Sequence, residues 1–158
     1  MTRQEFEKLI EEEFPKAVPE KFHALLKNVA FLAEQEPSAH VRKEEGLAEG
    51  ETLLGLYHGV PHTARGDYYG VGGTLPDTIT LYQGPIEEEA AELEAREQAV
   101  AEGKSWPSGP ERPLSQAASE LYIRKVIRET IWHEVAHYMG YDEHQVRGRE
   151  DKRDNDIL

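Results

Sequence analysis

The amino-acid sequence predicts one α+β domain, and two periodic patterns lead to this conclusion. Apolar residues recur at helical spacing over residues 6–14 and again over residues 114–139. Between these segments, three short runs at 28–36, 52–60 and 77–84 have the composition of strands. The chain has 158 residues, the length of one ordinary domain. We therefore expect helices at both ends and a small sheet of about three to four strands between them.

The N-terminal third begins with a helix signal. Thr2 and Glu5 have the spacing of a capping box, and the apolar residues that follow form one helical face. Pro15 and Pro19 are expected to interrupt this helix. A short second helix over residues 20–27 precedes the first strand, and the polar residues 38–51 are expected to form a loop.

The middle of the chain combines two strands with a helix of low apolar content. The strands at 52–60 and 77–84 are separated by a glycine-rich turn, and either strand is a candidate for the edge that pairs with an extended peptide. Residues 86–103 favour a solvated helix that packs weakly, because its only large aliphatic residues are Ile86, Leu93 and Val100. Three prolines then break the chain before the longest helical pattern, which Gly140 is expected to end. The charged tail, residues 148–158, is expected to fray.

Composition excludes several classes of function. The formal net charge is −13, which argues against nucleic acid as a partner, because phosphate binding requires a basic surface. The absence of cysteine excludes disulfides, thiolate nucleophiles and thiolate metal ligands. No segment resembles a signal peptide or a membrane span, so we expect a cytoplasmic protein without a membrane partner. Composition and pattern leave the oligomeric state open.

The segment HEVAH, residues 133–137, predicts a metal site. His133 and His137 are four residues apart, which places both imidazoles on one face of a helix, one turn apart. Glu134 lies beside the first histidine, where its carboxylate can accept a proton from a metal-bound water. Composition alone gives about a 5% chance of this five-residue pattern somewhere in the chain. The five residues alone are therefore weak evidence.

The pattern extends to Gly140 and Glu143, which lowers the chance expectation to about 0.1%. A third ligand ten residues after His133 reaches the same ion only if the helix stops and the chain turns back, which Gly140 permits. Besides Glu143, the neighbours His144 and Asp142 are alternative third ligands. Without cysteine, zinc, manganese, cobalt and iron all suit a site of two histidines and a carboxylate.

The segment HEVAHYMGYDEH resembles the zincins, and its spacing through Gly140 resembles their metzincin branch. Upstream, LLGLYHGVPHTARG and LPDTITLYQGPI resemble the minimal zincin-like metallopeptidases, small bacterial proteins of this size. The resemblance covers nearly the whole chain except residues 86–115, which look like a helical or loop insertion in a single domain, residues 1–158. It implies a small sheet packed against the active-site helix and the N-terminal helices. It also implies one Zn²⁺ ion bound by His133, His137 and the acid Glu143, with water in the fourth position.

Two features depart from the metzincin pattern. Glu143 stands where typical metzincins have histidine. The chain's only methionines are Met1 and Met139, so the downstream methionine turn of metzincins has no counterpart. We therefore expect one wall of the cleft to be absent, or to come from residues 86–115 or a second subunit.

These observations predict a zinc-dependent metallopeptidase that hydrolyses peptide or amide bonds, with Glu134 as the general base. Two alternatives remain: a metal-dependent hydrolase acting on other bonds, and a non-catalytic binding protein that zinc stabilises. Several side chains outside the motif are expected to be ordinary surface or packing residues, although some could line a cleft: His23, His40, His58, His62, Tyr68, Tyr69, Trp106 and Trp132.

Overall fold

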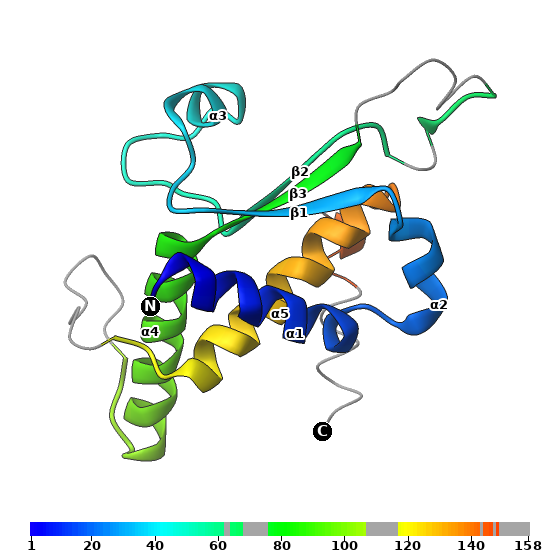
Figure 1. Cartoon of the computed structure of the whole chain (residues 1–158). Coiled ribbons are helices and arrows are strands. Elements are labelled where there is room, and N and C mark those ends of the chain that lie inside the picture. The colour runs from blue at the N-terminus through cyan, green and yellow to red at the C-terminus, as the bar shows by residue number, and fades with distance from the viewer. Residues whose placement is uncertain (62–63, 68–75, 107–116, 143, 147, 149–158) are drawn as a thin grey trace.

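The fold combines a three-stranded sheet with helices, as the sequence predicts. We describe a computed structural model of the chain, in which residues 1–61, 64–67, 76–106, 117–142, 144–146 and 148 are placed (Figure 1). The elements in chain order are α1 (Arg3–Ala17), α2 (Glu20–His23), η1 (Ala24–Leu26), β1 (Val29–Glu34), α3 (Ala39–Glu44), β2 (Gly55–His58), β3 (Asp77–Tyr82), α4 (Gln83–Ala101) and α5 (Glu120–Tyr138).

The sheet has the strand order β1-β3-β2, so the last strand in the chain is the central one. Strand β1 runs parallel to β3, with Phe31 beside Ile79, and β2 runs antiparallel to β3, with Tyr57 beside Ile79. The segment DTITLYQG therefore cannot offer a free edge, because both sides of β3 are paired. Of the two edge candidates from the sequence, only TLLGLYHG, which contains β2, lies at an edge.

Helix α5 is the centre of the hydrophobic core. Ile127, Ile131 and Val135 are fully buried and lie at the spacing of one helical face. Helices α1 and α4 pack against α5, and the helix also contacts β2 and β3 (Figure 1). From the sheet, Ile79 and Leu81 of β3 are fully buried in the same core. Removing α5 would therefore expose the apolar faces of two helices and the sheet.

Helix α1 begins as the sequence predicts and ends later than it predicts. The Thr2 hydroxyl accepts a hydrogen bond from the Glu5 backbone, and the Glu5 carboxylate accepts one from the Thr2 backbone, which completes the capping box. Pro15 lies inside the helix, which continues to Ala17. Near a helix end the missing N–H removes only one hydrogen bond, and burial of Ala17 holds the last turn in place.

Two further elements differ from the sequence expectation. Residues 39–44 form helix α3 where we expected a loop, and the Ser38 hydroxyl caps it by accepting from the Val41 N–H at 3.2 Å. Helix α4 packs more closely than expected, because Ala90 is fully buried beside Ile86 and Leu93. The buried methyl group of Ala90 adds contact surface that a count of large aliphatic residues alone does not include. Residues 107–116 lie outside the described part of the chain, so an insertion over 86–115 remains a prediction.

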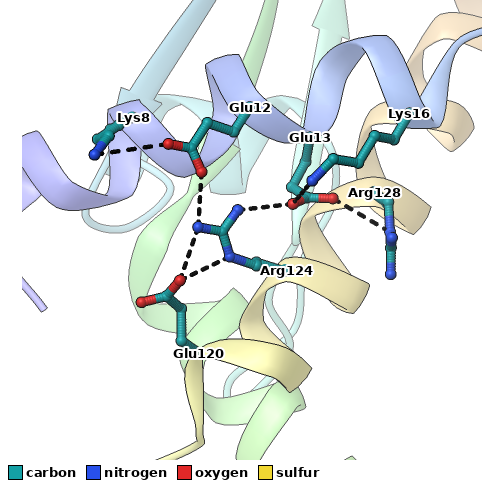
Figure 2. Close-up of polar contacts among 7 residues, drawn as sticks. All are labelled: Lys8, Glu12, Glu13, Lys16, Glu120, Arg124 and Arg128. Atoms are coloured by element: carbon teal, nitrogen blue, oxygen red, sulfur yellow. Dashed lines mark hydrogen bonds and ion pairs between the residues drawn. The ribbon is translucent and has the colours of Figure 1, made fainter.

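A cluster of charged side chains joins α1 to the first half of α5 (Figure 2). Arg124 of α5 contacts Glu12 at 2.7 Å and Glu13 at 2.8 Å on α1, and also Glu120 on its own helix at 2.7 Å. The Glu13 side chain is 1% exposed and also pairs with Lys16 at 2.7 Å. Removing either Glu13 or its partners would leave buried charge unpaired, so this cluster fixes how the two helices pack.

Candidate metal centre

Helix α5 ends at a turn that glycine makes possible. Gly140 has φ +88°, a backbone conformation that other residues rarely adopt. The Gly140 N–H donates to the His137 carbonyl at 2.9 Å, and the Tyr141 N–H donates to the Ala136 carbonyl at 3.0 Å. These two bonds form a Schellman motif, so the sharp stop predicted from the sequence is present.

His133 and His137 lie one helical turn apart, and their Nε2 atoms are 3.1 Å apart. Two imidazole nitrogens bound to one tetrahedral zinc at about 2.05 Å each would be about 3.3 Å apart. Both rings are partly exposed while their neighbours on α5 face the core. The spacing of the two nitrogens is thus close to that of two ligands of one zinc ion.

A backbone carbonyl orients the second imidazole. His137 Nδ1 lies 3.0 Å from the Tyr141 carbonyl oxygen, which can only accept a hydrogen bond. Nδ1 must therefore carry the proton, and Nε2 of the neutral ring is left as the ligand atom. The turn at Gly140 places this carbonyl, so the glycine acts on the site as well as on the chain direction.

Glu134 points from the same helix towards the sheet. Its side chain is 7% exposed, and Oε2 accepts a hydrogen bond from the Tyr57 N–H of β2 at 2.8 Å. Gly55 makes this approach possible. A Cβ on Gly55 would lie 2.7 Å from Thr130 Cγ2 and 3.0 Å from Glu134 Cγ, both too close for carbon atoms.

The hydrogen bond to Glu134 shows which way the backbone of β2 faces. In an antiparallel pair, alternate residues direct both N–H and C=O towards the partner strand. The Tyr82 N–H donates to the Leu54 carbonyl at 2.9 Å, so Leu54, Leu56 and His58 face β3. The backbone groups of Gly55 and Tyr57 therefore face outward. Glu134 lies at this outer edge of the sheet.

The third ligand falls outside what the structure describes. Glu143 is not among the described residues, so its role as a ligand remains a prediction. Of the two alternatives, His144 is exposed, and the Asp142 carboxylate accepts from the Gln145 N–H at 2.9 Å and caps the following turn. Across the described ranges, no three His, Asp or Glu side chains are grouped to hold a metal ion.

The structure describes some of the other histidines and aromatic residues singled out in the sequence and leaves the rest untested. His23 was expected at the surface, but it contacts the Val18 carbonyl at 2.7 Å and packs on Phe14, because the short α2 turns it back towards α1. His40 pairs with Glu44 on the surface, and His58 is exposed at the end of β2. His62, Tyr68 and Tyr69 lie outside the described residues. Trp106 and Trp132 are partly buried.

The sequence analysis missed a buried network beside Glu134. Asp77 is 4% exposed and accepts a hydrogen bond from the Tyr57 hydroxyl at 2.9 Å, and it forms an ion pair with Arg65. Burial, and then Asp77, raise the pKa of the Tyr57 phenol well above its ordinary value. Tyr57 therefore stays protonated near neutral pH, with its hydroxyl donating to Asp77. In the sequence, the sign of this network was an aspartate at the start of an otherwise apolar strand.

Part of this chain is similar to a known protein family. Residues 26–102 match the family model described as zincin-like metallopeptidase. A search of curated proteins found no match. The matched segment runs from η1 to α4 and includes every strand, but it ends before α5. Because the match does not include the histidines of α5, the sheet and the motif are independent evidence for the same resemblance. Within the described residues, no helix is long and apolar enough to cross a membrane.

Proposed function

We propose that the chain is a zinc-dependent peptidase, because its residues 26–102 match the zincin-like metallopeptidase family model. In this proposal His133, His137 and Glu143 hold one zinc ion, and Glu134 is the general base. The observation that carries the proposal is the convergence of two Nε2 atoms, 3.1 Å apart, beside a nearly buried carboxylate on the same helix.

Each side chain has a separate task in this reaction. A bound zinc ion would polarise the scissile carbonyl and lower the pKa of a bound water towards about 7. Glu134 would accept the proton of that water through Oε1 and pass it to the leaving amine. The Tyr57 N–H, bonded to Oε2, holds the carboxylate in one orientation throughout. The Tyr141 carbonyl keeps His137 in the tautomer that binds metal.

The outer edge of β2 is the proposed place for the substrate. An extended peptide can add to an exposed strand through main-chain hydrogen bonds. The Tyr57 N–H is already bonded to Glu134, so a peptide would pair through outward carbonyls such as that of Tyr57 and would pass the metal centre. In this proposal the substrates are peptides or proteins bound in extended conformation.

A purely structural zinc site is the weaker reading. The core around Ile127, Ile131 and Val135 is fully buried without any metal ligand, so the fold does not depend on zinc as a small metal-bound domain does. A structural site also has no use for a carboxylate next to an open coordination position. We therefore favour catalysis over a binding protein that zinc merely stabilises.

The test is the variant Glu134→Gln, measured as zinc-loaded protein on a quenched-fluorescent peptide library. Glutamine keeps an oxygen for the Tyr57 N–H but cannot take a proton at neutral pH. We expect one zinc per chain by mass spectrometry, unchanged from wild type, and a loss of hydrolysis of at least about 100-fold.

The matched control is Glu129→Gln, an exposed position on the same helix, which should retain wild-type hydrolysis. The proposal fails if Glu134→Gln hydrolyses peptides as fast as Glu129→Gln. It also fails if zinc-loaded wild type cleaves nothing in the library.

A further inference from the structure

Four side chains form a network of contacts beside the candidate metal centre: Tyr57, Arg65, Asp77 and Tyr138. We call this set the Arg65 network. Asp77, at the start of β3, is its buried anion, at 4% exposure. It accepts from the Tyr57 hydroxyl at 2.9 Å and pairs with the Arg65 guanidinium. Arg65 Nε also donates to the Val60 carbonyl at 3.0 Å, just past the end of β2.

Aromatic contacts join the same network to α5. The Tyr57 ring meets the Tyr138 ring edge to face, with centroids 5.7 Å apart and planes at 80°. The Arg65 guanidinium lies over the face of the Tyr138 ring, 5.0 Å from the ring centroid. The Tyr138 hydroxyl donates to the Leu25 carbonyl at 2.6 Å. Tyr138 directly follows His137, so the network reaches the end of the helix that bears the motif.

The end of β2 needs such support. Strand β2 has only four residues and pairs with one neighbour, and short edge strands open readily. Tyr57 is next to its last residue, and its N–H faces away from β3. Backbone pairing with β3 therefore does not use this N–H, and His58 is the last residue of β2 that pairs with β3.

We propose that Arg65 and Asp77 are positioning residues for the general base. They hold the end of β2, through the Tyr57 side chain and the Val60 carbonyl, so that the Tyr57 N–H stays on the Glu134 carboxylate. Arg65 thus acts on Glu134 through another residue and without touching the reacting atoms. The effect on catalysis rests on the function proposed above, whereas the effect on β2 does not.

The experiment follows amide hydrogen exchange at residue 57 by NMR in the zinc-loaded full chain. Three variants remove the network in graded steps. Tyr57→Phe deletes only the hydroxyl, Arg65→Met deletes the cation, and Arg65→Lys keeps the charge without the guanidinium fork that reaches two acceptors at once. The control is Arg124→Met, which removes a guanidinium from the charge cluster between α1 and α5 (Figure 2).

We expect the residue 57 amide to exchange at least about tenfold faster in Tyr57→Phe and Arg65→Met, and Arg65→Lys to recover part of the protection. Exchange at residue 57 in Arg124→Met should rise no more than the core amides of Ile127 and Ile131. Wherever wild type hydrolyses a peptide, kcat should fall about tenfold in Arg65→Met with the zinc content unchanged.

The inference is overturned if residue 57 keeps its wild-type exchange rate in both Tyr57→Phe and Arg65→Met. It is also overturned if Arg124→Met accelerates residue 57 as much, relative to the core, because the effect would then be one of global stability. Both of these outcomes are measured by amide hydrogen exchange and do not require hydrolysis. A failure of the proposed function can therefore be distinguished from a failure of this inference.

Discussion

The substitution Gly55→Ala tests whether β2 lies as close to α5 as the site requires. Gly55 does not have a positive φ, so alanine fits its backbone and only the new Cβ matters. That atom would lie 2.7 Å from Thr130 Cγ2, 3.0 Å from Glu134 Cγ and 3.2 Å from the Thr80 carbonyl oxygen. Thr130 cannot turn aside easily, since its hydroxyl donates to the Val126 carbonyl at 2.8 Å.

The magnitude follows from these distances. Crowding a packed interior by one methyl group costs about 1–3 kcal/mol of unfolding free energy. Replacing glycine returns about 0.4–1 kcal/mol by restricting the unfolded chain. A net loss of about 1–2 kcal/mol lowers Tm by about 2–8 °C for a chain of this length. Restoring a normal carbon–carbon contact moves Glu134 by about 0.5–1 Å, for which we expect kcat to fall about ten- to a hundredfold.

The assay is thermal unfolding of the zinc-loaded protein, followed by peptide hydrolysis on the same samples. Gly66→Ala is the matched control, because Gly66 also lacks a positive φ and a Cβ there meets nothing within 4 Å. We expect Gly66→Ala to keep the wild-type Tm or to exceed it slightly. If Gly55→Ala and Gly66→Ala unfold at the same temperature and hydrolyse equally, the close approach of β2 to α5 is refuted.

Two further predictions concern Glu13 and the third ligand. Burial raises the pKa of Glu13, but hydrogen bonds from Lys16 and Arg124 outweigh it and hold that pKa below the ordinary 4.5. Its ionised form therefore stabilises the fold above pH 4.5, and this stability is lost as pH falls through the native pKa. In urea unfolding of metal-free protein, Glu13→Gln should be less stable than wild type at pH 7, with a gap that narrows in acid; a constant gap would contradict this. For the metal, Glu143→Gln should lower zinc affinity at least about tenfold while His144→Ala retains it, and the reverse order by calorimetry would make His144 the ligand.

Local signals in the sequence were sufficient for several elements. Thr2 and Glu5 set the start of α1, Gly140 set the end of α5, and Ile79 and Leu81, two positions apart, gave one buried face of β3. In each case the cause lies within a few residues of its effect, which is the range that a pattern covers. The same holds for His133 and His137, because four residues along a helix fix their relative placement.

Other features depend on partners that a single segment cannot reveal. Helix α4 was expected to pack weakly because Ala90 adds little to an apolar pattern, although it is fully buried. Arg124 and Glu13 are 111 positions apart, so nothing near either residue indicates the ion pair. The partner of Glu134 is a backbone N–H, which any residue except proline supplies, so position 57 had no signal of its own. Helix α3, by contrast, had a local signal that we missed, the capping residue Ser38.

The central position of α5 in the core also affects how the protein folds during its synthesis. Helices α1 and α4 and the strands leave the ribosome before α5 does, yet their apolar faces close only on that helix. A chain that ends before residue 120 therefore lacks both its core and the two histidines. Because the same nineteen residues complete the core and carry His133 and His137, the nascent polypeptide gains its fold and the proposed metal ligands together.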